Sequence, residues 1–583
     1  MSRYTYARLL DPADIRILEL SPGKGKEEVV VQLSSTPLKT APHYEALSYT
    51  WGDPTITRSI LCSDGVVSVT TNLHDALANL RYKDRPRYLW VDAICINQTD
   101  SEEKSTQIPL MGEIYSSAQQ VVVWLGRMTD DVIGVFSCLR KMEKFVPMYG
   151  YGSFNMDRFM RLDYSAVVNL FQRPYFRRRW IVQEVVKSNH AIAVCGHETI
   201  PWLTIESVAS GIFARGLSSL MTPEEDEQMG FSAMNNIATI RAGKVKRSLF
   251  NLRKATWLFE CTSPHDRLYS LLGMASDLHE YDDIKPDYTL SHVDVFTKFA
   301  ASSILRNMDL DILPPCSMSE APMPSWVQQF DKYSMLGTIK IPESGWSFNA
   351  TKDTPVQCSF SDDGHVLRVS GKSVDIIKSI VPTPANTPVS EFPGDLDELM
   401  AALEVSSGPL NTMARQAMYL LASRKLAAGD NLESFLLDSN KYEQFCRVLL
   451  CDTPYRERAS GVFVEPLTKL FALQEIFCGG PTTEIVDRLP ECIDLAQSIG
   501  PLLSLITFHR SFCITGEGRM GEMPQNAKVG DLVCVLFGGK VPYVLRPRGD
   551  GRYTYVGDCF VYGLMDGEAM DMENIQAQEF ALV

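Results

Sequence analysis

Short apolar runs alternate with helical patterns between residues 44 and 200. Residues 45–49, 121–125 and 191–195 are short runs that predict buried strands. Residues 88–96 are almost continuously apolar, which is typical of a strand that is covered on both faces in a parallel sheet. Because strands and helices alternate here, we predict an α/β fold with a parallel sheet and right-handed crossovers.

Three helices are predicted between these strands. Asn72 is expected to cap the first, and Thr99 with Glu102 forms a capping-box pattern at the start of the second. Pro109 lies inside the second helix and should delay its start or kink it, because proline lacks a backbone donor. The third helix is expected to run from residue 171 to residue 186.

The pattern changes several times along the rest of the chain. A Gly-Gly turn at 538–539, between the β-branched runs 533–537 and 541–545, predicts a hairpin near the end. The domains that we predict are an N-terminal hairpin or extension over 1–43, the α/β domain over 44–200, a helical region over 201–321, a β-rich or irregular segment over 322–392, a helical region over 393–507, and a small β-barrel-like domain over 508–583.

Composition narrows the class of protein. Of the 583 residues, 45% are hydrophobic and 22% are charged, which is ordinary globular usage. The 71 acidic residues outnumber the 56 basic ones, and the formal charge is −15. This balance argues against nucleic acid as a partner, because phosphate affinity depends on clustered Lys and Arg. It also argues against docking on anionic membranes.

The chain shows no targeting or metal-binding pattern. The first residues lack an apolar signal core, and no stretch of about 18 apolar residues predicts membrane insertion. The 14 cysteines and nine histidines are scattered without metal-ligand spacing. We therefore expect a cytoplasmic protein with reduced thiols and no metal.

Polar and aromatic residues follow the predicted strands. They occur at 49–53, at Asn97 and Gln98, and at Gly126. Ligands of open parallel sheets bind beyond the carboxyl ends of the strands, so these positions are candidates for a binding site. Asp92 lies inside the second predicted strand, where burial would penalise its charge unless it were paired. A structural role for Asp92, such as anchoring a loop, is favoured over direct contact with a ligand.

A carboxylate candidate lies in the third predicted helix. Phe176, Trp180 and Glu184 are spaced at i, i+4 and i+8 and should share one face. A carboxylate beside an indole is a candidate active-site acid. Spacing alone favours a surface ion pair of Glu184 with Lys187. The arginines at 177–179 are interpreted as a solvated face, and Cys95 as a buried structural thiol.

Four ordered motifs resemble the fungal heterokaryon-incompatibility (HET) domain. They are YEALSYTWG at 44–52, LWVDAICINQ at 89–98, MGEIY at 111–115 followed by VWLG at 123–126, and RPYFRRRWIVQE at 173–184. Weaker resemblance continues through CTSPHDRLYSLLG at 261–273 and through the C-terminal region that contains GD at 530–531 and GDC at 557–559, as in HET-6-like proteins.

The resemblance implies self/non-self recognition and programmed cell death in a filamentous fungus, and distant similarity to TIR domains. It implies a TIR-like parallel sheet at the N-terminus, with Glu184 as the catalytic residue that cleaves NAD⁺ between ribose and nicotinamide. NAD⁺ is then a substrate, and no cofactor is needed. The residues expected to contact it are Ser48, Tyr49, Trp51, Gly52, Asp92, Asn97, Gln98 and Trp180.

A second hypothesis belongs to another class of function. TIR-like domains also act as scaffolds, and the motif residues are good core formers. On this hypothesis the chain is a non-catalytic module that triggers cell death through self-association or through contact with another incompatibility protein.

Overall fold

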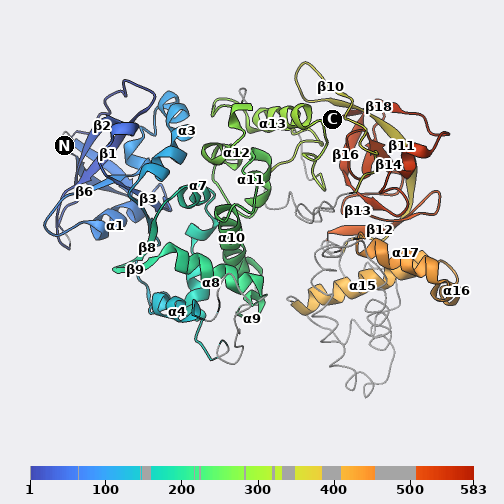
Figure 1. Ribbon diagram of the computed structural model, residues 1–583, viewed down its shortest axis with the longest axis horizontal. Helices are drawn as coiled ribbons and strands as arrows, with labels where there is room; N and C mark the ends of the chain where they lie inside the picture. The colour runs from blue at the N-terminus through green and yellow to red at the C-terminus, as the bar shows by residue number, and fades with distance from the viewer. Residues whose placement is uncertain are drawn as a thin grey trace. The chain divides into compact units, whose positions relative to one another are not determined.

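The computed structural model describes residues 2–25, 27–62, 65–144, 146, 159, 161–215, 217–221, 225–280, 284–317, 322–330, 348–383, 409–452, 507 and 509–583. The chain forms two compact units, Met1–His292 and Val293–Val583. Figure 1 shows the elements of both units coloured along the chain. The finer division into domains made from the sequence stays a prediction.

The first unit is built on one nine-stranded sheet. Its strands are β1 (Asp14–Leu20), β2 (Val30–Pro37), β3 (Glu45–Tyr49), β4 (Thr57–Cys62), β5 (Gly65–Thr70), β6 (Arg87–Trp90), β7 (Gln120–Trp124), β8 (Ala191–Cys195) and β9 (Glu198–Pro201). Their spatial order is β5-β4-β2-β1-β6-β3-β7-β8-β9.

The helices of this unit follow or connect the strands. They are α1 (Thr71–Leu80), α2 (Asp92–Cys95), α3 (Ser101–Ser117), α4 (Val135–Met142), α6 (Ser165–Phe171), α7 (Ile181–Val186), α8 (Trp202–Ala214), α9 (Ser218–Met221), α10 (Glu225–Arg241), α11 (Leu249–Ala255) and α12 (Asp266–Tyr269). A 3₁₀ turn, η3 (Pro174–Arg177), stands between α6 and α7.

The centre of the sheet is parallel, which confirms the predicted α/β fold. Strands β6, β3, β7 and β8 run in the same direction, and every residue of β3 is buried. Along the chain β3 comes first, yet β6 and β7 pair with it on opposite sides. The carboxyl end of β3 is therefore the point at which the strand order reverses, where open parallel sheets bind ligands.

The first residues of the chain are part of this sheet. Strands β1 and β2 form an antiparallel hairpin, and β1 also pairs with β6. The strands β4, β5 and β9 were not predicted from the sequence. Each is antiparallel to at least one neighbour and lies toward an edge of the sheet.

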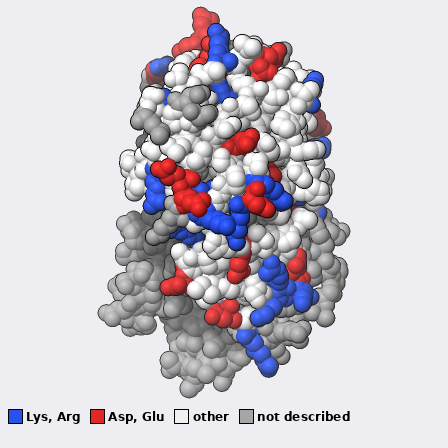
Figure 2. All heavy atoms as spheres, turned by 90° about the vertical axis from the view of Figure 1, so that its left-hand side faces the viewer, with Lys and Arg blue, Asp and Glu red and all other residues white. Residues whose placement is uncertain are grey.

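Figure 2 views the molecule from the side of these N-terminal strands. On this face Lys and Arg side chains are intermingled with Asp and Glu side chains, and neither sign forms a continuous area.

The strand predicted over 88–96 is wrong in its second half. β6 ends at Trp90, and Asp92–Cys95 forms the short helix α2. The backbone amides of Ile94 and Cys95 donate to the carbonyl of Val91, which closes the helical turn. The sequence is apolar throughout because α2 is buried as well as β6, so apolar character alone did not distinguish the two.

The predicted helix starts are shifted by one or two residues. Thr70, not Asn72, caps α1, and its hydroxyl accepts a hydrogen bond from the amide of Leu73. Asp100 caps α3 in place of Thr99, and its carboxylate accepts from two amides of the first turn. Pro109 does not delay α3, which runs through it to Ser117.

The helix predicted from residue 171 to residue 186 is broken. α6 ends at Phe171, η3 begins at Pro174, and Arg178 is extended, with φ −70° and ψ 125°. Only Ile181–Val186 then forms α7. Proline favours this break because it has no amide to continue the helix, and it disfavours helical geometry at the residue before it.

The second unit contains a closed barrel. Its strands are β10 (Cys358–Phe360), β11 (Leu367–Ile380), β12 (Arg510–Thr515), β13 (Met520–Pro524), β14 (Leu532–Leu536), β15 (Tyr543–Pro547), β16 (Tyr553–Asp558), β17 (Phe560–Val561) and β18 (Gln578–Leu582). The long strand β11 pairs with both β18 and β14, so the ring β14-β15-β16-β18-β11 closes. The predicted hairpin is confirmed as β14 and β15.

Apolar side chains fill the barrel. Val533, Val535, Val544 and Val556 are buried together with Cys513 and others. The helices of this unit are α13 (His292–Asn307, which starts at the last residue of the first unit), α15 (Pro409–Ala428), α16 (Leu432–Leu437) and α17 (Ser439–Leu449). Most of the predicted helical region 393–507 lies outside the described residues.

Candidate functional site

Glu184 lies at the carboxyl end of the parallel strands, where the sequence placed a site. Its carboxylate comes from α7, has no exposed surface, and accepts a hydrogen bond from the hydroxyl of Ser48 on β3. The hydroxyl of Tyr175 is also hydrogen-bonded to Ser48, at 2.7 Å. These hydrogen bonds therefore hold the carboxylate at the carboxyl end of the central strand β3.

The charge of Glu184 is balanced by an arginine and not by Lys187. Arg178 Nη1 lies 2.6 Å from Glu184 Oε1. The other terminal nitrogen of Arg178 lies 3.5 Å from Asp92 Oδ2. Only 16% of the Arg178 side chain and 7% of the Asp92 side chain are exposed. One guanidinium thus bridges two carboxylates that the sequence had singled out separately.

Trp51 completes this group of contacts. Its indole nitrogen donates to Asp92 Oδ2 at 2.8 Å, while 39% of the residue remains exposed. Ser48, Trp51, Asp92, Arg178 and Glu184 therefore form one connected network, which we call the Glu184 network. It extends from a fully buried carboxylate to an exposed aromatic ring.

The break in the predicted helix makes this network possible. Because Arg178 is extended between η3 and α7, the chain forms a short bridge with Glu260. The amide of Glu260 donates to the carbonyl of Arg177 at 2.6 Å, and the amide of Arg179 donates to the carbonyl of Glu260 at 2.7 Å. This pairing holds the Arg178 backbone beside α7, from which Glu184 projects.

Burial shifts the pKa values of several groups in the network and beside it. Burial raises the pKa of Glu184, and the positive charge of Arg178 acts against that shift. Burial disfavours the charge on Arg178, but Glu184 and Asp92 outweigh it and raise the pKa of the guanidinium. Burial also raises the pKa values of Tyr49 and Tyr175. The pair of Arg178 and Glu184 is consequently held together by charge in an apolar setting.

Other residues predicted to contact a ligand occupy positions in the strand and the loops beside the network. Tyr49 is buried on β3. Gly52 has a φ of 78°, a conformation that glycine adopts without strain, and it turns the chain away from β3. The side chain of Gln98 donates to the carbonyl of Asp92 at 2.9 Å. These three residues shape the loops around the Glu184 network.

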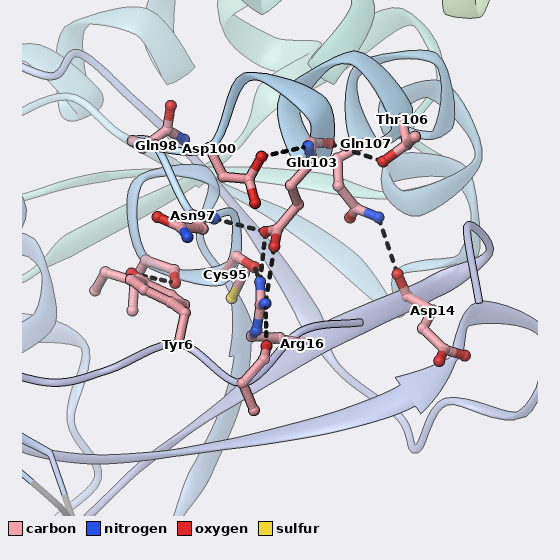
Figure 3. A network of polar contacts seen from close by, with 12 residues as sticks. Tyr6, Asp14, Arg16, Cys95, Asn97, Gln98, Asp100, Glu103, Thr106 and Gln107 are labelled. Atoms are coloured by element: carbon pink, nitrogen blue, oxygen red, sulfur yellow. Dashed lines mark hydrogen bonds and ion pairs between the residues drawn. The ribbon is translucent and has the colours of Figure 1, made fainter. Parts of the chain in front are cut away.

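Figure 3 shows how the loop of Asn97 and Gln98 is held. Arg16 on β1 binds Glu103 on α3 with two hydrogen bonds of 2.6 and 2.9 Å, and also donates to the carbonyl of Cys95 at 2.9 Å. Glu103 in turn accepts a hydrogen bond of 2.7 Å from the backbone amide of Asn97. Through Arg16, strand β1 therefore fixes the position of the loop that follows α2.

Trp180 takes a different direction from the one that helical spacing predicted. Its indole nitrogen donates to Asp266 Oδ2 at 3.0 Å. Because η3 is not part of α7, Phe176, Trp180 and Glu184 do not share one helix face. Trp180 remains next to the network through the chain, since the amide of Glu184 donates to its carbonyl.

Sequence reasoning missed two members of the site. The arginines at 177–179 were interpreted as a solvated face, but Arg178 is largely buried and Arg179 is only 1% exposed. Tyr175 was not considered. A usable signal was present, because the three arginines are flanked by Tyr175, Phe176 and Trp180, whereas a solvated face is usually polar.

Two other features lie outside this site. Cys95 is fully buried, as predicted, and burial raises its pKa to about 12, which disfavours the reactive thiolate. An open depression lined by His43, Ala118, Gln119, Asn189 and His190 lies at the amino ends of β3, β7 and β8, opposite to the Glu184 network. The described residues hold no group of three or more His, Cys, Asp or Glu side chains placed to bind a metal ion.

The class of the protein follows from comparison with known families. Residues 44–184 match the family "Heterokaryon incompatibility protein (HET)", and residues 502–583 match the "Het-6 beta-barrel domain". The chain therefore carries a HET domain, whose match ends at Glu184, and a Het-6 barrel. This confirms the resemblance drawn from the four motifs.

Similarity to a HET-6 protein extends over the whole chain. It is 26% identical over 690 residues to "Heterokaryon incompatibility protein 6, OR allele" of Neurospora crassa, an alignment that covers 100% of this chain and 98% of that relative. These matches support a role in heterokaryon incompatibility. No solved structure matches the chain.

None of the helices in the described part of the chain combines the length and the apolar composition needed to cross a membrane.

Proposed function

We propose that this protein acts in heterokaryon incompatibility and that its HET domain cleaves NAD⁺ at the Glu184 network. The observation that carries the proposal is the position of Glu184. Its carboxylate lies at the carboxyl end of β3, where the strand order of the parallel sheet reverses. Glu184 is also the last residue of the segment that matches the HET family. Two carboxylates and an exposed tryptophan meet at this one point.

Cleavage of NAD⁺ requires the protein mainly to place a negative charge close to the ribose. When the C1′–N bond of NAD⁺ breaks, its electron pair leaves on nicotinamide, which becomes neutral. The ribose then carries positive charge in an oxocarbenium-like state, which a carboxylate at Glu184 would stabilise as in glycoside hydrolysis. Water adds to C1′ and one proton is released. The Trp51 ring offers a flat apolar face for the nicotinamide or the adenine.

The test is nicotinamide release by the purified full-length chain, followed across a series of protein concentrations so that activity dependent on assembly is detected. We expect turnover in the wild type and its loss in Glu184→Gln, which keeps the size of the side chain and its bond with Ser48. The matched control is Lys187→Gln, which changes a charge at the end of α7 without altering the partners of Glu184. Equal turnover in wild type and Glu184→Gln would refute the proposed catalytic role.

The complete burial of Glu184 favours a second candidate function. Its oxygens are bonded to Ser48 and Arg178, so the described arrangement gives a sugar no direct access to them. On this alternative the chain is a non-catalytic module that triggers cell death through self-association or an incompatibility partner. Glu184 would then serve only to stabilise the HET domain.

The two candidates differ in what Glu184→Gln does in living cells. If the domain is catalytic, the variant accumulates normally but no longer kills or depletes NAD⁺. If it is a binding module, the variant still kills as long as it folds. Thermal unfolding of the purified variant separates loss of function from loss of fold.

A further inference from the structure

Arg178 occupies the position that faces Glu184. Its guanidinium lies 2.6 Å from Glu184 and 3.5 Å from Asp92, and it is the cation of this network. Without that guanidinium, two carboxylates would lie close together with no cation between them, next to the edge of the exposed Trp51 ring. Such a pair repels itself and attracts a flat organic cation.

We propose that the Arg178 side chain autoinhibits the site. Its guanidinium occupies the position of the cationic nicotinamide riboside group of NAD⁺, and the site stays closed until the guanidinium moves away. This inference rests on the proposed function and adds its regulation. The guanidinium is planar and positively charged, like the nicotinamide ring of the substrate, and both can pair with a carboxylate.

The exposed fractions of the two side chains indicate which partner of the pair can move. Glu184 has no exposed surface, whereas 16% of the Arg178 side chain is exposed. Arg178 is therefore the outer partner of the pair and can turn toward solvent, while Glu184 stays fixed by Ser48. Breaking the pair opens the site without unfolding β3 or α7.

One segment holds Arg178 in its closed position. We call residues 256–266 the clamp segment. Thr256 accepts hydrogen bonds from Arg179 through its carbonyl and its hydroxyl, at 2.9 and 3.0 Å. Glu260 pairs with the backbone on both sides of Arg178, and Asp266 binds Trp180.

The clamp segment therefore contacts the chain before, beside and after Arg178. These contacts lie within the first unit, and Thr256 and Arg179 are buried, whereas Glu260 is exposed. A displacement of this segment would move the Arg178 backbone away from α7. The clamp segment is thus the element through which a partner, or assembly of several chains, would open the site.

The experiment compares wild type, Arg178→Gln, Glu184→Gln and the Lys187→Gln control as full-length chains. Two quantities are measured: nicotinamide release from NAD⁺, and binding of carba-NAD, an analogue that cannot be hydrolysed. We expect Arg178→Gln to bind carba-NAD about tenfold more tightly than wild type, because a closed state favoured about ten to one weakens the apparent affinity by that factor. Its nicotinamide release should rise to a similar degree.

The outcomes separate the inference from the proposed function. Tighter carba-NAD binding by Arg178→Gln without any turnover supports the closed site and overturns the glycohydrolase. Turnover in wild type that is lost or unchanged in Arg178→Gln overturns the inference and leaves the glycohydrolase standing. If Arg178→Gln neither binds more tightly nor turns over faster, the inference is wrong.

A second measurement avoids the risk that Arg178→Gln fails to fold. Wild-type chain is treated with phenylglyoxal, which modifies accessible arginines, and the Arg178 peptide is followed by mass spectrometry. Carba-NAD should increase modification of Arg178 severalfold while leaving Arg140 unchanged, since Arg140 donates to the carbonyl of Thr199 on the edge strand β9 and has no contact with the Glu184 network. Unchanged or reduced modification of Arg178 overturns the inference.

Discussion

Buried carboxyl groups in this protein are stabilised in two different ways. In the HET domain Glu184 is paired with Arg178, so its charge is compensated. In the barrel unit Glu522 is fully buried on β13, and the hydroxyl of Tyr419 on α15 donates to both its oxygens. Burial raises the pKa of Glu522 to about 8, so this carboxyl group is mostly protonated at neutral pH.

The stability of the barrel unit should therefore depend on pH through Glu522. The ordinary pKa of the group is 4.5, so between 4.5 and about 8 the folded state binds a proton that the unfolded state has lost. Stability is full below this window and falls as pH rises through it, by about 1.4 kcal/mol per pH unit at most. Above about pH 8 the loss is complete.

Glu522→Gln should remove this dependence, since an amide does not titrate and still accepts from Tyr419. We expect the melting temperatures of wild type and variant to be close at pH 6, and the variant to melt higher at pH 9. Differential scanning fluorimetry of the full chain measures both. The matched control is Glu573→Gln, whose side chain is exposed and which should behave as wild type. Parallel pH profiles for wild type and Glu522→Gln would contradict the assignment.

At the scale of elements, the position of the site depends on close approach of two glycines. A Cβ on Gly112 of α3 would lie 2.4 Å from the carbonyl oxygen of Gly273, and a Cβ on Gly273 would lie 2.6 Å from Gln183 Oε1 on α7. The turn that follows α12 thus packs directly between α3 and α7. This packing joins the HET motifs to the CTSPHDRLYSLLG motif.

Gly112→Ala should force these elements apart. The contact is with backbone, which cannot move aside as a flexible side chain can, so we expect a loss of about 1–3 kcal/mol in stability. Thermal unfolding of the full chain measures it, with Gly549→Ala as control because a Cβ at Gly549 meets nothing within 4 Å. A melting temperature unchanged by Gly112→Ala would show that α3 and this turn are not in contact.

The sequence predicted the central strands well because they are buried on both faces. β3, β7 and β8 were found almost to the residue from their apolar runs. α2 was mistaken for strand, because the same apolar composition serves a buried helix turn. β4 was missed because its first three residues are exposed, so its pattern depends on neighbouring strands that the sequence does not place.

The site was predicted in its carboxylates and aromatic residues but not in its connection. The strand-end rule selected Trp51, the resemblance to the HET domain implied Ser48, Asp92 and Glu184, and the structure joins all four in one network. The missing residue, Arg178, could not be assigned because its burial depends on the break at Pro174 and on pairing with Glu260, which is 82 residues away in sequence. For the same reason, helical spacing wrongly placed Phe176, Trp180 and Glu184 on one helix face.

At the scale of the molecule, the HET match is shorter than the folded unit that contains it. The match spans residues 44–184, whereas the compact unit spans Met1–His292. β1 supplies Arg16 to the network of Figure 3, and the clamp segment supplies the partners of Arg179 and Trp180. Both lie outside the matched residues.

A fragment of residues 1–292 should therefore fold alone, and a fragment of residues 44–200 should not. The shorter fragment loses β1 and β2 from the sheet and leaves Glu103 without Arg16, and an unpaired buried charge costs about 3–5 kcal/mol. Circular dichroism and cooperative thermal unfolding distinguish the two fragments. Cooperative unfolding of the shorter fragment would contradict this view of the domain.

The most direct test of the central claim is intracellular NAD⁺ after induced expression of the full-length chain in a filamentous fungus. Wild type and Glu184→Gln are compared at equal protein level, with viability scored in the same cultures. The account predicts that wild type depletes NAD⁺ before cells die and that Glu184→Gln does neither. Death with undiminished NAD⁺, or equal depletion by both proteins, would contradict it.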